Sequence, residues 1–164
     1  MNYFFKPFLL RIILPVFMVV CLLSACKEID VFEKNTPIPN MHWQNNFNAL
    51  GSFKITDTTS FYNIFIVLRH TDKYVYNNIW LNIGLQAPED SAIQYQKINI
   101  SLGTDANGWE GVGMNDIWEI RKLISGRPKK FIKPGYYTFN ITQLMRDNPL
   151  EYIMSVGLRV EKVK

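Results

Sequence analysis

The sequence predicts an all-β fold, an antiparallel β-sandwich of the jelly-roll type, preceded by an N-terminal signal segment. Apolar and polar residues alternate with a period of two along most of the chain after Trp43, which is the pattern of half-buried strands. Short clusters of turn-forming residues separate these runs. No helix-length segments lie between them to make the crossovers of a parallel sheet. A small closed barrel is the alternative architecture.

Residues 1–25 are the predicted signal peptide. Residues 1–11 are basic, and residues 12–23 form an uncharged apolar run. That run is shorter than the roughly 18–20 residues that a membrane-spanning helix needs. It leads into Leu23-Ser24-Ala25-Cys26, which resembles a bacterial lipobox. The resemblance implies that Cys26 becomes the first residue and carries lipid on its sulfur and its amine, which anchors the protein to a membrane of the cell envelope.

Lys27, and not Asp, follows the lipobox cysteine. By resemblance to the enterobacterial sorting rule, this residue favours the outer membrane and leaves the choice of leaflet open. Residues 26–40, with Pro37 and Pro39, are expected to form the lipidated cysteine and a short tether. The sandwich domain is expected over residues 41–164.

The predicted strands follow in order, with long alternating runs at residues 64–68, 79–85, 93–102, 137–141 and 152–160 and shorter candidates at 30–33, 53–56, 117–124 and 130–132. The apolar phase slips by one residue at Gln96-Lys97, which predicts a β-bulge. Residues 117–124 also fit one face of a helix, so a helical turn is the alternative there. A turn or two of helix is expected at residues 142–146, because Pro149 would stop it.

Composition excludes several classes of function. Both cysteines, Cys21 and Cys26, precede the predicted domain, which excludes a disulfide scaffold and a multi-thiolate metal site within it. Removing residues 1–25, which contain Lys6 and Arg11 and no acid, lowers the formal charge from +4 to +2. A charge of that size does not indicate nucleic-acid binding. We therefore expect no metal, no cofactor and no nucleic-acid partner.

Arg69-His70-Thr71-Asp72 ends one predicted strand and is the only sequence that suggests acid–base chemistry. No motif places a serine or cysteine nucleophile beside it, so we expect no enzymatic activity. We interpret Arg69, His70 and Asp72 as part of a candidate interaction surface.

The longest irregular stretch, residues 104–118, contains glycines in an order that does not match a phosphate-binding loop. Asp105, Asn107, Glu110 and Asp116 offer oxygens to calcium, but without the spacing of an EF-hand. Trp109 is the best candidate for an exposed aromatic residue. With Trp43, Trp80 and Trp118 it suggests a sugar-stacking platform, so the alternative function is a surface lipoprotein that binds a glycan.

Residues 121–133 carry six basic side chains and no acid, and Arg121, Lys129 and Lys130 complete the candidate interaction surface. Such a patch suits lipid phosphates or an acidic partner, and a solvated hairpin explains it equally well. Asp57-Thr58-Thr59 and Asp90-Ser91-Ala92 resemble the O-glycosylation acceptor of Bacteroidota.

Several short segments spread along the chain carry a resemblance to one known family. The longest runs from Val67-Leu68-Arg69-His70-Thr71-Asp72 to Tyr76-Asn77-Asn78-Ile79-Trp80-Leu81. The others are Ile38-Pro39-Asn40, Trp43, Asp57-Thr58-Thr59, Gly108-Trp109, Gly113-Met114, Lys133-Pro134-Gly135, Met145-Arg146-Asp147-Asn148-Pro149 and Arg159-Val160-Glu161-Lys162. Together these segments resemble the gliding-motility lipoprotein GldH family of Bacteroidota. The resemblance implies an accessory lipoprotein of gliding motility and its secretion system that acts by protein–protein interaction, with Cys26 as its one defined site.

Overall fold

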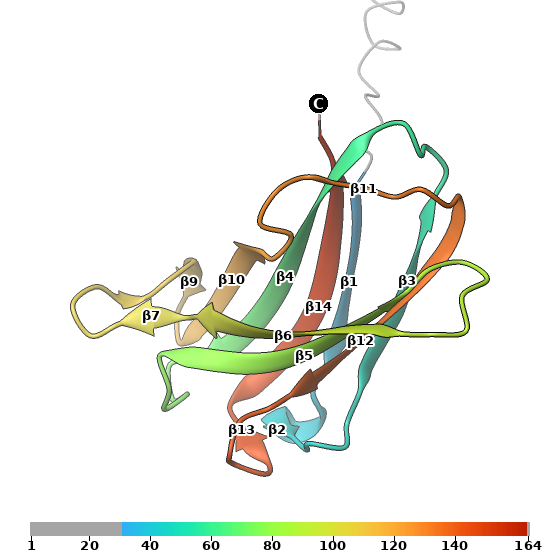
Figure 1. The fold of residues 1–164 in the computed structure, drawn as a ribbon. Helices are drawn as coiled ribbons and strands as arrows, with labels where there is room; N and C mark the ends of the chain where they lie inside the picture. The colour runs from blue at the N-terminus through green and yellow to red at the C-terminus, as the bar shows by residue number, and fades with distance from the viewer. Residues whose placement is uncertain (1–30, 164) are drawn as a thin grey trace, which may run out of the picture. The chain divides into compact units, whose positions relative to one another are not determined.

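The computed structural model describes residues 31–163, and these residues form a β-sandwich (Figure 1). The signal peptide and the lipid site predicted at Cys26 lie outside the described residues. One sheet runs in the order β1 (Val31–Pro37), β14 (Ile153–Lys162), β4 (Phe61–Thr71), β10 (Ile117–Leu123) and β9 (Val112–Met114), with β11 (Lys129–Lys130) paired to β4. The other runs in the order β3 (Ala49–Ile55), β12 (Gly135–Gln143), β5 (Asn78–Gln86) and β6 (Gln94–Ser101).

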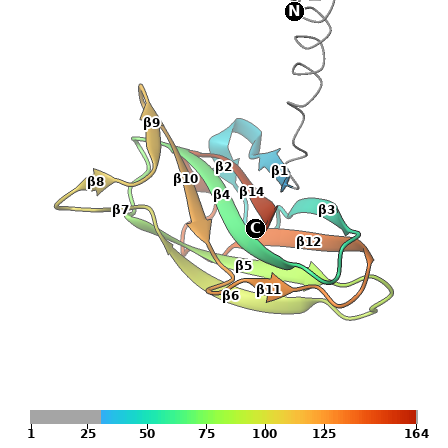
Figure 2. The same cartoon turned by 90° about the horizontal axis from the view of Figure 1, so that it is seen from above.

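The strand order is that of a jelly roll. Along the chain the eight principal strands are β1, β3, β4, β5, β6, β10, β12 and β14. When these strands are numbered one to eight along the chain, strands 1, 8, 3 and 6 are neighbours in one sheet. Strands 2, 7, 4 and 5 are neighbours in the other, which is the jelly-roll order. The pairings within both sheets are antiparallel, and Figure 2 shows the sheets as two layers. The prediction of an all-β antiparallel sandwich is confirmed.

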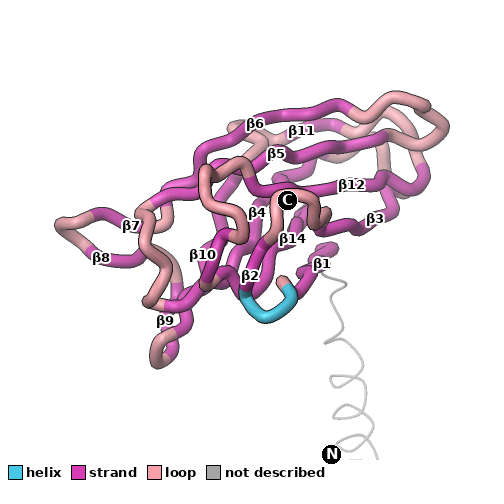
Figure 3. Tube along the Cα trace, turned by 90° about the horizontal axis from the view of Figure 1, so that it is seen from below, coloured by secondary structure: helices cyan, strands magenta, loops and turns pink. Residues whose placement is uncertain are grey.

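Four shorter strands and one helical turn complete the described part. β2 (His42–Trp43) pairs with β13 (Leu150–Glu151), and β7 (Gly103–Thr104) pairs with β8 (Gly108–Trp109). The turn η1 (Pro39–Met41) is the one helical segment of residues 31–163, as Figure 3 shows. Within this part of the chain, no helix has the length and apolar character needed to cross a membrane.

The core fills the space between the sheets because each strand turns alternate side chains inward. Ile64, Ile66 and Leu68 of β4 face Ile79, Leu81 and Ile83 of β5 across the sandwich, and all six are buried. Burying such aliphatic side chains is the main force that holds the sheets together, at roughly 1.5–3 kcal/mol each.

The predicted β-bulge at Gln96-Lys97 is wrong. β6 pairs with β5 in unbroken register from Gln94 opposite Leu85 to Ser101 opposite Asn78. The apolar phase slips because Tyr95 lies on the solvent face, where it is 58% exposed. The register shift that the structure does contain lies in β14, between Ile153 and Ser155.

The helix expected at residues 142–146 is also absent from the structure. Thr142 and Gln143 belong to β12, and the chain continues extended beside β5, where the backbone N–H of Leu144 donates to the carbonyl of Trp80 at 2.8 Å. Residues 117–124, where the sequence allows a strand or a helical turn, form strand β10 (Ile117–Leu123).

The candidate strand at residues 30–33 overlaps β1, which is longer than that candidate. Residues 31–37 form β1 along the whole length of its pairing with β14, although they fall in the stretch predicted as tether. Phe32 of this strand packs against the core.

Candidate functional site

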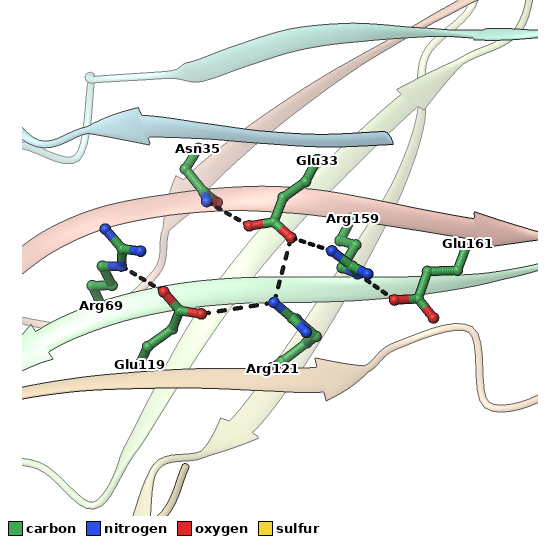
Figure 4. Close-up of polar contacts among 7 residues, drawn as sticks. All are labelled: Glu33, Asn35, Arg69, Glu119, Arg121, Arg159 and Glu161. Atoms are coloured by element: carbon green, nitrogen blue, oxygen red, sulfur yellow. Dashed lines mark hydrogen bonds and ion pairs between the residues drawn. The ribbon is translucent and has the colours of Figure 1, made fainter. Parts of the chain in front are cut away.

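The outer face of the six-stranded sheet carries a row of alternating charges (Figure 4). We call it the ion-pair row, and it consists of Glu33 of β1, Arg159 and Glu161 of β14, Arg69 of β4, and Glu119 and Arg121 of β10. Three arginines balance three glutamates, so the row is neutral. It spans four neighbouring strands and joins the first strand of the domain to the last.

The distances show a continuous chain of contacts. Arg69 Nε lies 2.6 Å from Glu119 Oε2, and Arg121 Nη2 lies 3.8 Å from Glu119 Oε1. Arg121 Nη2 is also 3.5 Å from Glu33 Oε2, and Arg159 Nη1 is 2.8 Å from the same oxygen. The Glu33 carboxylate therefore pairs with two guanidinium groups, that of Arg121 on β10 and that of Arg159 on β14.

Strand register produces this row. Glu33 is directly opposite Arg159, and Glu119 is directly opposite Arg69. Val67 of β4 lies on this outer face and outside the core, yet it is 1% exposed. Its register partner on β10 is Arg121, and long arginine side chains typically cover apolar neighbours with their stems while their charged ends stay in solvent.

Glu33 remains ionised within this network. Its partial burial alone would raise the pKa of the carboxyl, but hydrogen bonds from Arg159 and Asn35 and the positive charges of Arg121 and Arg159 outweigh burial. The net effect lowers the pKa of Glu33 below its ordinary value.

Exposed apolar side chains border the row at the β9 edge. Val112 and Met114 are 77% and 74% exposed, and they pair with Glu119 and Ile117 of β10, so they lie on the same face as the row. Leu123, further along β10, is exposed as well. Apolar residues beside arginine-rich polar groups are typical of surfaces that bind another protein.

Three of the residues selected from sequence lie on this outer face. Arg69 and Arg121 belong to the ion-pair row, and Lys130 is opposite Phe61, an exposed residue of β4 on the same face. Lys129 is opposite the buried Tyr62 and so faces the second sheet. Asp72 lies in the turn after β4, where its backbone N–H donates to the carbonyl of Asp116 at 2.8 Å.

His70 lies in the interior, and Trp109 is half-buried against it, so neither joins that surface. His70 is fully buried, and its Nδ1–H donates to the carbonyl of Thr71 at 2.8 Å. The ring of Trp109 packs edge-on at 4.6 Å from the ring of His70, and Tyr74 lies 5.6 Å from it. Trp109 is thus half-buried, because the β7–β8 hairpin folds it onto His70, and the expected exposed aromatic is not found there.

The environment of His70 disfavours its charged form. Burial lowers the pKa of the imidazole, and the hydrogen bond to Thr71 opposes this only in part. Among residues 31–163, Nε2 has no hydrogen-bond partner. His70 therefore contributes to packing as a neutral side chain.

The oxygens suggested for calcium are not grouped. Glu110 pairs with Lys122 and accepts a hydrogen bond from Ser101 at 2.9 Å, so its carboxylate is already used. No three His, Cys, Asp or Glu side chains of residues 31–163 come together to hold a metal ion.

The four tryptophans are dispersed. Trp43 is fully buried and its indole N–H donates to the carbonyl of Phe47 at 3.1 Å, whereas Trp80 of β5 is 44% exposed. Trp118 is half-buried beside Gly113, and Trp109 contacts His70. No ring contact joins two of them within the described residues, so they form no common platform for a sugar.

Asp57 has a structural role in the turn before β4. Its carboxylate accepts the backbone N–H of Thr59 at 2.8 Å and the hydroxyl of Ser60 at 2.7 Å, and it pairs with Lys162 at 2.7 Å. The hydrogen bond from Lys162 is the largest of the effects that hold the pKa of Asp57 well below its usual range. Glycosylation at Thr58 or Ser91 stays a prediction.

Four members of the ion-pair row were not predicted from the sequence, namely Glu33, Glu119, Arg159 and Glu161. The exposed Val112 and Met114 were not predicted either. A signal was present, since charged residues two positions apart in a predicted strand share one face. The pairs Glu119/Arg121 and Arg159/Glu161 have that spacing. Only the strand order shows that they meet each other and Glu33.

Comparisons with known proteins agree along most of the chain. A family model described as GldH lipoprotein matches residues 30–160. A gliding motility lipoprotein GldH homolog of Christiangramia forsetii is 29% identical over 152 residues, which is 87% of this chain and 90% of that protein. The gliding motility lipoprotein GldH of Flavobacterium johnsoniae is also 29% identical over 152 residues, or 86% of this chain and 90% of that protein.

Among solved structures, the infectious bursal disease virus VP2 subviral particle aligns with 84% of this chain at 12% identity. The TM-score is 0.35, and the aligned part is 34% of the viral chain. That likeness is too weak to support any inference about this protein.

Proposed function

The chain belongs to the GldH lipoprotein family, and from this premise we propose that it is an accessory protein of the gliding motility machinery and its associated secretion system that acts by binding another protein. The chain aligns with gliding motility lipoproteins over 90% of their length. It is therefore a gliding motility lipoprotein of the cell envelope. The proposal adds how it acts, through a docking surface and without catalysis.

The observation that carries this proposal is the outer face of the six-stranded sheet. There a neutral, internally paired row of charges lies beside the exposed Val112 and Met114. Rows of preformed ion pairs present arginines in fixed positions, so a partner that contacts them loses little side-chain entropy on binding. Arginine and methionine are also among the residues enriched at protein interfaces.

We propose that Cys26 carries the lipid and holds the domain at the outer membrane. The lipobox ending in Cys26 and the following Lys27 support this. Several acyl chains on one residue anchor a protein stably, because each buried methylene contributes about 0.8 kcal/mol. The sheet begins at Val31, so the docking face is tied by a short segment to the lipidated residue.

We infer a non-enzymatic role for the domain. The histidine that suggested acid–base chemistry, His70, is buried against Trp109 and Tyr74, and its hydrogen bond is to a backbone carbonyl. A general base must reach the proton it removes, and a side chain sealed in the core has no access to substrate.

Complementation of a deletion strain tests the proposal. A strain that produces the Val112→Asp/Met114→Asp variant should lose colony spreading and adhesin secretion as fully as the deletion, while the lipidated protein remains in the envelope. The matched control is Tyr136→Asp, which changes an exposed residue of β12 in the other sheet. Full complementation by the Val112→Asp/Met114→Asp variant would contradict docking through this face.

A further inference from the structure

A cavity of about 560 Å³ opens between the two sheets on the side opposite β1. Residues of β11, in the six-stranded sheet, and of β6, the edge strand of the four-stranded sheet, both line it. Pairing does not join these two edges, so the sandwich is open here. The volume falls within the range of about 300–1,000 Å³ that is typical of small-molecule sites.

The buried residues of the lining are apolar, and its polar residues (Asp90, Gln94, Gln96, Ser125, Lys129, Lys130 and Lys133) are partly or fully exposed. Ile64 and Leu158 line it from one sheet, and Ile83, Leu85 and Tyr137 from the other. The hydroxyl of Tyr137 already donates to the carbonyl of Lys133 at 3.0 Å, so it is not free to bind a polar ligand. Apart from the Tyr137 hydroxyl, no polar side chain of the lining is buried, so the buried part of the cavity suits hydrocarbon.

Lysines surround the mouth. Lys133 Nζ lies 2.5 Å from Asp90 Oδ1, which pairs the one acidic residue of the lining with one of its three lysines. Within the described part of the chain, Lys129 and Lys130 have no ion pair. Two positive charges at the mouth are therefore available to an anion.

The placement of Lys129 is specific to this mouth. It is opposite Tyr62, whose side chain is buried, and the next inward-facing residue, Phe131, is part of the core. Lys129 thus extends from a strand face that otherwise packs against the second sheet. A lysine directed inward at a sheet edge can serve to prevent edge-to-edge pairing, in which case the cavity would bind nothing.

We propose that this cavity binds a single-chain anionic amphiphile, a long-chain fatty acid, with its hydrocarbon between the sheets and its carboxylate at Lys129 and Lys130. An apolar interior with cations confined to the mouth matches the two halves of such a molecule. The site lies at the open edge between the two sheets, away from the ion-pair row, with Lys129 on the inward side of β11 and Lys130 on its outer side. It adds a ligand to the proposed docking role.

Photolabelling in membranes tests the proposal with the full-length lipidated protein. Isolated envelopes are incubated with hexadecanoic acid that bears a diazirine on its chain, and labelled peptides are mapped by mass spectrometry. We expect the label on peptides that contain Ile83–Leu85 or Phe131, and excess unlabelled hexadecanoic acid should abolish it.

Two variants separate the contributions of charge and space. Lys129→Glu/Lys130→Glu should reduce labelling about tenfold, because two attractions become repulsions. Ala87→Phe, which puts bulk into the cavity without changing charge, should reduce it similarly. Lys54→Glu/Lys73→Glu makes the same charge change on exposed residues outside the lining and should label as the wild type does. Thermal unfolding of each protein shows that it is folded.

Three results would overturn the proposal. Equal labelling of the wild type and the Lys129→Glu/Lys130→Glu variant, or labelling spread over the surface, would show that the lysines guard the sheet edge only. Equal labelling by a diazirine-bearing hexadecanol would show that the mouth does not select an anion. Stronger labelling of the cavity by a two-chain phospholipid probe would assign the site to bilayer lipid instead of free fatty acid.

Discussion

Substitution of Gly157 by alanine tests the contact between β1 and β14, which ties the N-terminal end of the domain to the sheet. Gly157 lies opposite Asn35 of β1 and Val67 of β4. A Cβ at this position would lie 2.7 Å from the Cα of Asn35 and closer still to the carbonyl oxygen of Lys34 and to Asn35 Oδ1. Cβ contacts below 3.0 Å are essentially never observed, and two of these atoms belong to backbone, which cannot rotate away.

The expected cost follows from that geometry. β1 would have to move away by about 1 Å, which stretches backbone hydrogen bonds of about 2.9 Å beyond their usual limit of about 3.2 Å. Overpacking of this kind costs about 1–3 kcal/mol. For a domain of this size it should lower Tm by roughly 4 to 12 °C.

The assay is thermal unfolding followed by circular dichroism, together with amide hydrogen exchange of residues 31–37. Gly157→Ala should lower Tm and accelerate exchange in β1 more than in β5. The control is Gly126→Ala, where no atom lies within 4 Å of the added Cβ and only the left-handed backbone (φ +65°) is strained. This control should leave β1 exchange unchanged. A Gly157→Ala protein with the wild-type Tm and wild-type exchange in β1 would refute the described packing of β1 on β14.

Three further outcomes follow from the contacts described above. Because the pKa of His70 is lower in the folded protein than its ordinary value of 6.5, the unfolded chain binds the extra proton, and stability should fall as the pH drops below about 6.5. Urea unfolding from pH 7.5 to 5 should show this loss, His70→Gln should flatten it, and His42→Gln, at an exposed site, should keep it. Arg121→Gln removes a half-exposed member of a row whose glutamates keep other arginines, so it should cost less than about 1 kcal/mol in denaturant unfolding, and a larger loss would mean that the row is needed for folding. Cys26→Ala should move the protein out of the membrane fraction, and unchanged fractionation would contradict lipid anchoring.

Much of the fold could be predicted because strand periodicity is a local property. Ile64, Ile66 and Leu68 alternate with residues of the opposite face, and the structure buries all three. The prediction failed where an apolar residue faces solvent. Tyr95 of β6 is exposed, which imitates a change of phase and led to a bulge that is not there.

The site was less predictable, because it depends on which strands become neighbours. Glu33 and Arg121 are far apart in sequence, and they meet because their strands, β1 and β10, belong to one sheet with the order β1-β14-β4-β10. Trp109 illustrates the opposite case. A tryptophan in a glycine-rich loop suggested exposure, but the hairpin that holds it folds back onto His70.

The claim that the outer face of the six-stranded sheet docks a motility or secretion protein is tested most directly by site-specific photocrosslinking in intact cells. A photoreactive phenylalanine derivative at Met114 should give a covalent adduct with one protein of that machinery, identified by mass spectrometry. The same residue at Tyr136, which is comparably exposed on the other sheet, should give no such adduct. Adducts at Tyr136 with none at Met114, or none at either position, would contradict the assignment of this face as the docking surface.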